Sequence, residues 1–457
     1  MNYISTRGLA GSLTFKEVLL AGLASDGGLY VPETIPEFSP QQLSQLATLG
    51  YTELAYEIIA PFVGKCFSEK ELRGMIDAAY GNFRHGAIAP LTQLAHDQFV
   101  LELFHGPTLA FKDFALQLLG HLMEATLKES KKKSIVVGAT SGDTGSAAIA
   151  GLKGRENIDI VILYPEGRTS DVQRKQMTTL PDANVHALAV KGTFDDCQDL
   201  VKVIFSDTDF RNQVNLLAVN SINWARVMAQ VVYYFYAALA LGAPARSVNF
   251  SVPTGNFGDI YAGYIARRMG LPMGKLIIAT NQNDILARCL KTGEYKVTGV
   301  HASLSPSMDI QVASNFERLL FDLYGRDGKR IGQMMQDFKV TKSLTLSPSA
   351  HAEFAAAFDA HAVSDKETLK VIEATHTACG YLLDPHTAVG VKAAAEHAGI
   401  TVTLATAHPS KFPEAVKKAT GETPALPAHM ADLYERKERI ATLDNNIDTL
   451  KALVLGL

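Results

Sequence analysis

Leu101-Glu-Leu-Phe-His-Gly-Pro-Thr-Leu-Ala-Phe-Lys-Asp-Phe114 is the stretch of the sequence that decides the fold. It begins as an apolar strand, breaks at Gly106-Pro107 and continues as a helix whose first turns carry Thr108, Lys112 and Asp113. A lysine at such a turn is partly removed from water, which disfavours its charged form and lowers its pKa. The resulting neutral amine can attack an aldehyde or accept a proton; a solvated surface lysine is the ordinary alternative.

Composition indicates an ordinary globular protein with a small-molecule partner. The chain has 457 residues, of which 47% are hydrophobic and 20% charged, which allows two or three domains and a large core. Its 43 basic and 47 acidic residues give a net charge of -4. Because there is no overall basic field, we expect neither nucleic acid nor membrane as a partner.

The cysteines and the apolar segments favour a cytoplasmic location. The four cysteines are far apart and form neither a C-x-x-C pair nor a cluster with histidine, so we expect no metal site and a reducing compartment. The first residues lack the features of a secretory signal or a transit segment. The longest apolar run, 231–243, is too short to span a bilayer and is interpreted as a buried helix.

Residues 1–95 are predicted to form a mostly helical N-terminal cap. Helix-period segments separated by turn-rich pieces cover 15–24, 40–47, 51–62 and 68–80.

From residue 99 onward, short β-branched runs alternate with longer helical stretches, which predicts two α/β domains with parallel sheets. The expected strands are 99–104, 134–138, 158–164, 185–190, 248–252, 276–280 and 401–405. We expect a large domain made of 96–132 and 240–457 and a smaller one made of 133–239.

Three polar segments follow predicted strands, where open α/β sheets bind ligands. These are Ala139-Thr-Ser-Gly-Asp-Thr-Gly-Ser146, Pro253-Thr-Gly-Asn-Phe-Gly-Asp259 and Thr406-Ala-His-Pro-Ser-Lys411. The second can cradle a phosphate on backbone N–H groups at a helix start, although it lacks the lysine and hydroxyl residue of a P-loop; a tight turn without a ligand is the alternative. The first offers hydroxyls and backbone donors to a carboxylate, unless Asp143 is simply a helix cap.

An amine, a hydroxyl-rich loop, a phosphate-type loop and a polar residue after the last strand are what pyridoxal 5'-phosphate and an amino-acid substrate require together. The sequence resembles the bacterial and fungal threonine synthases, within the tryptophan-synthase-β-like (fold type II) pyridoxal-phosphate enzymes. The resemblance rests on Phe104–Asp113, Ala139–Ala147, Pro253–Asp259 and Thr406–Phe412, and extends to Ser5-Thr-Arg-Gly8 and Asp26-Gly-Gly-Leu-Tyr30.

The resemblance implies a role for each segment. Lys112 would form the Schiff base with the cofactor, and Thr406 would face the pyridine nitrogen. The cofactor phosphate would be bound by Gly255, Asn256, Phe257, Gly258 and Asp259 in the large domain. The substrate carboxylate would be bound by Ser141, Gly142, Asp143 and Thr144. The wider fold-type family usually has asparagine where this chain has Asp143.

The implied reaction converts O-phospho-L-homoserine and water to L-threonine and phosphate by γ-elimination and β-addition, in threonine biosynthesis, with Lys112 carrying protons. A neutral threonine beside the ring nitrogen suits elimination and replacement rather than transamination. The leaving phosphate needs an anion site, for which Arg168, Lys411 and Arg226 are candidates.

Two alternatives stay open. A serine or threonine dehydratase, or a β-replacing synthase, would share the lysine and the loops but need no second phosphate site. A cofactor-binding protein that keeps the fold without turnover would also share them. The chain is expected to be a monomer or a homodimer.

Overall fold

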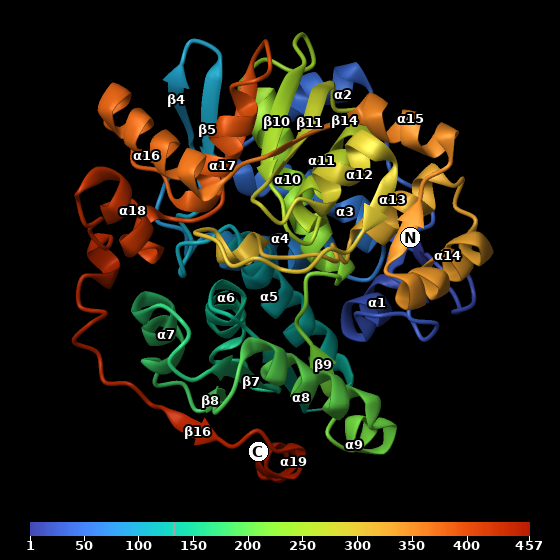
Figure 1. Cartoon of the computed structure of the whole chain (residues 1–457). Helices are drawn as coiled ribbons and strands as arrows, with labels where there is room; N and C mark the ends of the chain where they lie inside the picture. Colours follow the sequence, from blue (N-terminus) through green and yellow to red (C-terminus); the bar gives the residue numbers. More distant parts are fainter. Residues whose placement is uncertain (131–132) are drawn as a thin grey trace.

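The computed structural model describes residues 1–130 and 133–457, which form two α/β units and an N-terminal region (Figure 1). The larger unit is built on a six-stranded sheet of order β14-β11-β10-β15-β5-β4. Its strands are β14 (Phe358–Ala362), β11 (Met273–Thr280), β10 (Val248–Pro253), β15 (Thr401–Ala405), β5 (Gln98–Glu102) and β4 (Leu91–Ala95). All neighbours pair in parallel except β4, which is antiparallel to β5.

Helices cover the larger sheet, and α17 packs against β10, β11 and β15. The helices of this unit are α5 (Lys112–Ser130), α10 (Trp224–Ala240), α11 (Gly258–Arg268), α12 (Ile285–Thr292), α13 (Phe316–Leu323), α14 (Gly328–Thr341), α15 (Pro348–Ala357), α16 (Asp365–Cys379), α17 (Pro385–Ala394) and α18 (Pro413–Thr420). A separate antiparallel pair is formed by β12 (Glu294–Lys296) and β13 (Ser343–Thr345). The predicted buried helix is α10, whose side chains are almost all buried.

The smaller unit is a five-stranded parallel sheet of order β16-β8-β7-β6-β9. Its strands are β16 (Ala441–Leu443), β8 (Val185–Val190), β7 (Ile158–Pro165), β6 (Ser134–Ala139) and β9 (Leu216–Ala218). Its helices are α6 (Asp143–Leu152), α7 (Asp171–Thr178), α8 (Phe194–Ser206), α9 (Thr208–Gln213) and α19 (Ile447–Leu455).

The structure departs from the expected domain limits in three places. β4, expected in the N-terminal cap 1–95, pairs with β5 in the larger sheet, and α10, expected mostly in the smaller domain 133–239, packs against α5 and α11. Residues 240–457 are expected to belong entirely to the large domain, but β16 pairs with β8 in the smaller sheet. Figure 1 shows the C-terminal segment running from α18 past β16 to α19 at the smaller unit. A strand of three residues is too short to show a hydrophobic period. The sequence pattern therefore does not predict that β16 pairs with the smaller sheet.

The N-terminal region combines the predicted helices with a small sheet. Its helices are α1 (Phe15–Ala21), α2 (Pro40–Leu46), α3 (Tyr51–Val63) and α4 (Glu69–Tyr80), which confirms the four helical predictions. The antiparallel sheet of order β2-β1-β3 contains β1 (Asn2–Ser5), β2 (Leu13–Thr14) and β3 (Tyr30–Pro32). Their apolar faces join the main hydrophobic core rather than a core of their own.

The two α/β units meet where α5 packs against α6. Two glycines allow this approach: a Cβ on Gly120 would collide with the carbonyl oxygen of Gly151, and a Cβ on Gly151 with that of Leu116. Because α5 begins at Lys112 and α6 begins at Asp143, the packing brings the starts of both helices together.

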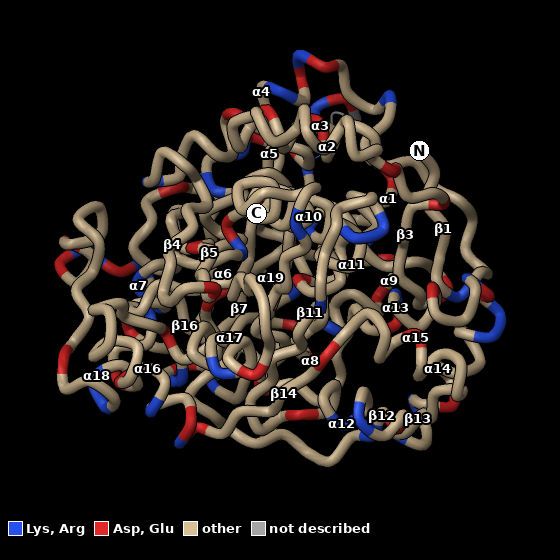
Figure 2. Tube along the Cα trace, turned by 90° about the horizontal axis from the view of Figure 1, so that it is seen from above, with Lys and Arg blue, Asp and Glu red and all other residues tan. Residues whose placement is uncertain are grey.

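Charged residues are spread over the outside of the molecule. Blue and red positions are interspersed around the periphery in Figure 2, in keeping with the small net charge. No helix in the described part of the chain has both the length and the apolar composition needed to cross a bilayer.

Candidate active site

Lys112 lies at the start of α5 with a buried ammonium group. Its Nζ donates to Oδ2 of Asp143 at 3.3 Å. Burial lowers the pKa of Lys112; the nearby charges of Lys411 and Arg226 lower it further, and Asp143 opposes them. A lysine of this kind loses its proton more easily than an exposed one, so it suits nucleophilic attack and proton transfer.

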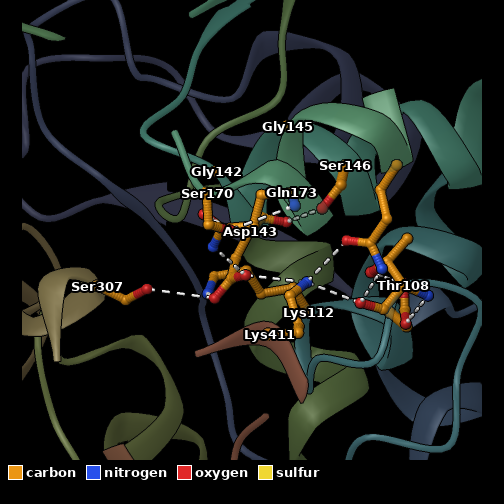
Figure 3. A network of polar contacts seen from close by, with 12 residues as sticks. Thr108, Lys112, Gly142, Asp143, Gly145, Ser146, Ser170, Gln173, Ser307 and Lys411 are labelled. Atoms are coloured by element: carbon orange, nitrogen blue, oxygen red, sulfur yellow. Dashed lines mark hydrogen bonds and ion pairs between the residues drawn. The ribbon is translucent and has the colours of Figure 1, made fainter. Parts of the chain in front are cut away.

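Asp143 is the centre of the polar network drawn in Figure 3. Besides Lys112, its carboxylate contacts Nζ of Lys411 at 2.9 Å, Nε2 of Gln173 at 2.8 Å and the hydroxyl of Ser307 at 3.3 Å. Burial alone would raise the pKa of Asp143, but the two lysines hold it well below its usual range. The side chain is therefore a buried anion that neutralises two buried cations.

The second lysine of the network, Lys411, is held much more tightly than Lys112. It ends the 3-10 helix Pro409–Lys411 and its side chain is completely buried. Its Nζ donates to the carbonyl oxygen of Thr108 at 2.7 Å and to Oε1 of Gln176 at 3.2 Å, in addition to Asp143. Because its donors are engaged by three acceptors, Lys411 is a structural cation. Lys112 has one hydrogen-bond acceptor among the described residues, Asp143, and its ammonium lies 4.8 Å from the centre of the Phe111 ring.

The turn that presents Lys112 is stabilised by Asp113. The Asp113 carboxylate accepts from the backbone N–H of Thr108 and from its hydroxyl, both at 2.8 Å. Burial raises the pKa of Asp113 to about 6, although these two donors and Lys411 act in the opposite direction. Gly106 is needed in this turn because a Cβ there would overlap the Asp113 side chain.

The loop after β10 lies near the same network and has open backbone N–H groups. In the part of the chain that the structure describes, the N–H groups of Gly255, Asn256 and Phe257 have no hydrogen-bond acceptor. Phe257 adopts a left-handed conformation with φ 63°, and α11 starts at the next residue, which adds the open N–H groups of its first turn. Such an array favours an anion.

Gly255 is enclosed on its other side. A Cβ at this position would lie 2.9 Å from the carbonyl oxygen of Ser307 and 3.1 Å from Cδ1 of Ile310. Ser307 belongs to the 3-10 helix Pro306–Met308, and its hydroxyl is the one that contacts Asp143. The same short segment therefore joins the β10 loop to the lysine network.

Asp259, in the first turn of α11, has a different environment from Asp143. Its Oδ1 accepts from the hydroxyls of Tyr233 at 2.6 Å and Tyr234 at 3.0 Å. Burial raises the pKa of Asp259 to about 6, against the effect of the two tyrosines and of Lys112. The side chain of Asp259, which the sequence predicts to bind the cofactor phosphate, is thus hydrogen-bonded to two tyrosines of α10.

The loop after β6 is partly closed on itself. The hydroxyl of Thr140 accepts from the N–H groups of Gly142 and Gly145, both at 2.9 Å. Gly142 has φ 154°, and a Cβ there would collide with the Gln173 side chain. Ser141 is exposed and Thr144 half-buried, and neither hydroxyl has a hydrogen-bond partner within residues 1–130 and 133–457.

Thr406 lies beside Lys112, because its carbonyl oxygen accepts from the N–H of Phe111 at 2.8 Å. Its buried hydroxyl has no partner among the residues that the structure describes. On the other side of the network, Nε2 of His386 accepts from the N–H of Ser307 at 3.3 Å. The Nδ1 of the same ring contacts Asp384 at 2.9 Å, so Asp384 orients the histidine that supports Ser307.

Arg226, at the start of α10, is a buried cation with open donors. Its Nε and one terminal nitrogen have no hydrogen-bond partner in the described part of the chain. Burial lowers the pKa of Arg226 to about 10, and its charge reaches Lys112. Arg168, by contrast, is exposed on the loop after β7.

The structure thus brings Lys112, the loop 141–144, the loop 255–259 and Thr406 together at one place. It also adds residues that the sequence analysis does not select, of which Ser307, Gln173, Gln176 and His386 are the main ones. No local motif marks these four residues, since each acts through a contact with a distant segment.

Family models match most of the chain. The model described as pyridoxal-phosphate dependent enzyme matches residues 88–362. The model described as threonine synthase N terminus matches 2–80, and the one described as threonine synthase, C-terminal, matches 387–454.

Full-length relatives agree with these matches. The chain is 54% identical to the threonine synthase of Pseudomonas aeruginosa over 99% of this chain and 98% of the relative. The identity to the threonine synthase of Saccharomyces cerevisiae is 42%, over 97% and 95% of the two chains.

Solved structures give the same result. The crystal structure of a PLP-bound threonine synthase from Brucella melitensis superposes with a TM-score of 0.98 at 52% identity, over 99% and 98% of the chains. The yeast threonine synthase superposes with a TM-score of 0.94 at 41% identity, over 99% and 98%. A maize serine racemase, at 13% identity and a TM-score of 0.51, shares the fold alone.

Proposed function

Because the chain belongs to the threonine synthase family of pyridoxal-phosphate-dependent enzymes, we propose that it converts O-phospho-L-homoserine and water to L-threonine and phosphate. The fold, the cofactor class and the kind of enzyme follow from family membership. The substrate and the role of each residue are the proposal, and they are supported by the contacts around Lys112.

The residues present fit pyridoxal 5'-phosphate. Three open N–H groups before α11 and the start of that helix suit a phosphate, and the enclosure of Gly255 leaves no space for a side chain there. The weakly held amine of Lys112 suits the aldehyde, and the unpartnered hydroxyl of Thr406 suits a ring nitrogen. When bound, the cofactor withdraws electrons from the substrate carbons and so makes their protons acidic.

Lys112 is proposed to carry the protons. In the overall reaction the Cγ–O bond to phosphate breaks, a Cβ–O bond to water forms, and Cγ becomes a methyl group. Protons must therefore leave Cα and Cβ and be returned to Cγ and Cα. Nζ of Lys112 is suited to these transfers because burial lowers its pKa while Asp143 stabilises its protonated form.

Asp143 is proposed to be the counter-ion of Lys112 rather than a ligand of the substrate carboxylate. The sequence analysis groups it with Ser141, Gly142 and Thr144 as substrate-binding. Two carboxylates at contact distance repel each other, and Asp143 is held in its anionic form by two lysines. The free hydroxyls of Ser141 and Thr144 are the better partners for the carboxylate.

Arg226 is proposed to receive the phosphate of the substrate. The reaction brings two phosphate groups to the site, and the loop 255–259 provides for that of the cofactor. Three cations are candidates from the sequence. The ammonium of Lys411 already contacts three acceptors, and Arg168 is exposed to solvent. Arg226 has buried N–H donors that have no hydrogen-bond partner in the described part of the chain. A buried guanidinium without partners is costly, so an anion of the substrate would relieve it.

The observation that carries the proposal is that the buried Lys112 is linked, through Asp143 and Ser307, to a loop with open N–H groups. Product analysis after incubation with O-phospho-L-homoserine tests it: threonine and phosphate are expected in equal amounts. Conversion of threonine or O-acetylserine instead would indicate the dehydratase or the β-replacing synthase, and no conversion of any of the three would indicate a binding protein. The Lys112→Ala variant should lose activity by about 10⁴-fold or more.

Cytoplasmic location and a monomeric or homodimeric state belong to the same proposal. The four thiols are free, which supports a reducing compartment.

A further inference from the structure

A cluster of two histidines and an aspartate lies on the outer strand of the larger sheet, apart from the lysine network. Asp359 and His361 are two residues apart on β14, so their side chains leave the same face of the strand. His397 comes from the turn after α17, where its N–H donates to the carbonyl oxygen of Ala394 at 3.0 Å. β14 occupies the end of the sheet, beside β11 (Figure 1).

The ligand atoms of the three side chains converge. Nε2 of His361 lies 3.1 Å from Nε2 of His397, which lies 3.6 Å from Oδ2 of Asp359, and the three ligand atoms lie within 4.8 Å of one another. Ligand atoms bound tetrahedrally to zinc at about 2.0–2.2 Å are about 3.3–3.6 Å apart. Of the two shorter separations, one lies at the upper end of this range and the other just below it.

A hydrogen bond between the rings does not account for the whole cluster. The Nε2 atom of His397 faces both the second histidine and the aspartate, and as a neutral ring it carries at most one proton there. If His397 donates that proton, it serves one of its two neighbours. If His361 donates to His397 instead, the lone pair of His397 faces the Asp359 carboxylate. A cation placed among the three atoms satisfies all of them at once.

We propose that Asp359, His361 and His397 bind a divalent transition-metal ion, with zinc as the first choice. Two imidazoles and a carboxylate are ligands that zinc prefers, and the Asp359 side chain, 45% exposed, leaves a coordination position open to water.

The charges that face the cluster nearly cancel. Lys275 on β11 and Glu396 beside α17 both act on His397, and Glu396 also acts on His361. Lys275 donates to the carbonyl oxygens of Ala355 and Ala356, at 2.8 and 3.0 Å, so its ammonium is occupied elsewhere. Glu396 is itself paired with Lys392 at 2.5 Å, so Asp359 is the anion that the cluster offers to a cation.

The metal would join the outer strand β14 to the end of α17. α17 starts at Pro385, next to Asp384 and His386, which orient Ser307 at the lysine network. A metal bound there would therefore hold α17 against β14, and α17 supports the active site through His386 and Ser307. The metal would have a structural role, without a part in proton transfer. No metal site is expected from the sequence, which has no cysteine–histidine cluster at metal-ligand spacing. His361 and His397 are too far apart in the chain to form a recognisable motif.

Titration of the tag-free holoenzyme with Zn²⁺, followed by calorimetry, tests the proposal. One zinc ion per chain should bind saturably and raise the midpoint of thermal unfolding. Co²⁺ in its place should give the intense visible absorption of a four-coordinate site with nitrogen and oxygen ligands. His361→Ala and His397→Ala should each weaken zinc binding by about 100-fold or more.

His376→Gln is the matched control, because His376 has one carboxylate neighbour, Glu422 at 3.8 Å, and no second histidine. Asp359→Asn keeps the shape of the side chain and is therefore expected to fold like the parental protein. It should weaken zinc binding by about tenfold or more. Absence of saturable binding to the parental holoenzyme would overturn the proposal. Binding that is equal in the Asp359, His361 and His376 variants would overturn it as well.

Discussion

The loops after β6 and β10 are similar in sequence character, yet the structure gives them opposite electrostatic properties. Both are rich in glycine, both join a strand to a helix, and each carries an aspartate in the first turn of that helix. After β10 the backbone N–H groups stay open, and burial raises the pKa of Asp259 to about 6. After β6 the hydroxyl of Thr140 accepts hydrogen bonds from two N–H groups. Two lysines hold the pKa of Asp143 well below its usual range.

The difference shows that a glycine loop at a helix start does not by itself define an anion site. Whether such a loop binds an anion depends on two properties: whether its N–H groups already donate to an acceptor, and whether the aspartate beside it is charged. The β10 loop is left open to an anion, whereas the β6 loop already contains one, Asp143, which serves the lysines. Variants of both loops and of Arg226 test this contrast.

Asp143→Asn removes the anion from the β6 loop while keeping its shape. We expect kcat for threonine formation to fall by about 100-fold, because the protonated form of Lys112 loses its counter-ion. Asp143 raises the pKa of the Lys112 amine, which is free once the substrate has taken its place on the cofactor, so removal of Asp143 should move the acid limb of the kcat profile to lower pH. Steady-state rates across pH measure both effects. Ser307→Ala, which removes one weak contact of Asp143, serves as a milder control, and a profile unchanged by Asp143→Asn contradicts the role given to the anion.

Gly255→Ala tests whether the open loop holds the cofactor. The added methyl would lie 2.9 Å from the carbonyl oxygen of Ser307, so the loop must shift and its N–H groups lose their alignment. We expect the Kd of the apoenzyme for pyridoxal 5'-phosphate to rise by about 10- to 100-fold, measured by absorbance titration. Gly74→Ala is the control, since nothing lies within 4 Å of a Cβ in that helix. Equal affinities for the two variants would exclude the loop as the cradle.

Arg226→Gln asks whether the site has a second anion position apart from the β10 loop. We expect the KM for O-phospho-L-homoserine to rise by about tenfold while the Kd for the cofactor stays within about twofold, because a charge-assisted contact is replaced by a neutral one. Arg168→Gln, at an exposed position, should change neither quantity. If the cofactor Kd rises instead, the guanidinium belongs to the first phosphate and the separation of the two anion positions is wrong.

Asp259→Asn isolates the smallest effect, on stability. The pKa of Asp259 in the folded protein, about 6, lies above its ordinary value of 3.8. Its contribution to stability is therefore full below pH 4 and is lost as the pH rises through 6, by up to about 3 kcal/mol. Urea unfolding between pH 4 and 7 should show a shallower decline in the variant.

Asp143 should behave in the opposite way in the same experiment. Since its pKa is lowered in the folded protein, its contribution is present above about pH 4 and is lost only as the pH falls further. If Asp143→Asn and Asp259→Asn change the pH dependence of stability in the same direction, the electrostatic contrast between the loops is wrong.

Much of the framework could be predicted from the sequence. All seven predicted strands of the α/β units are present, because continuous apolar runs identify buried parallel strands. β14 is not predicted from the sequence. Its residues, Phe358-Asp-Ala-His-Ala362, include one large apolar side chain, and the strand lies at the edge of the sheet, where no continuous apolar run is needed. β9 and β16, with three residues each, are too short to carry a period.

The site could be predicted only as far as its local motifs reach. Lys112 and the two loops stand out because each follows a strand. The roles of Ser307, Gln173 and Lys411 depend on contacts with Asp143, from segments that only the packing of the two α/β units brings together. The same limit applies to Asp143 itself: whether an aspartate after a strand caps a helix, binds a ligand or neutralises lysines is decided by partners that its neighbours in sequence do not reveal.

Two buried lysines meet one aspartate in this protein, and the account requires that only Lys112 carries the cofactor. Reduction of the holoenzyme with borohydride, followed by proteolysis and mass spectrometry, identifies the lysine that does so. The pyridoxyl label is expected on Lys112, whose amine has one hydrogen-bond acceptor in the described part of the chain. It is not expected on Lys411, whose amine is held by Asp143, Thr108 and Gln176. A label on Lys411, or no labelled lysine at all, would contradict the account.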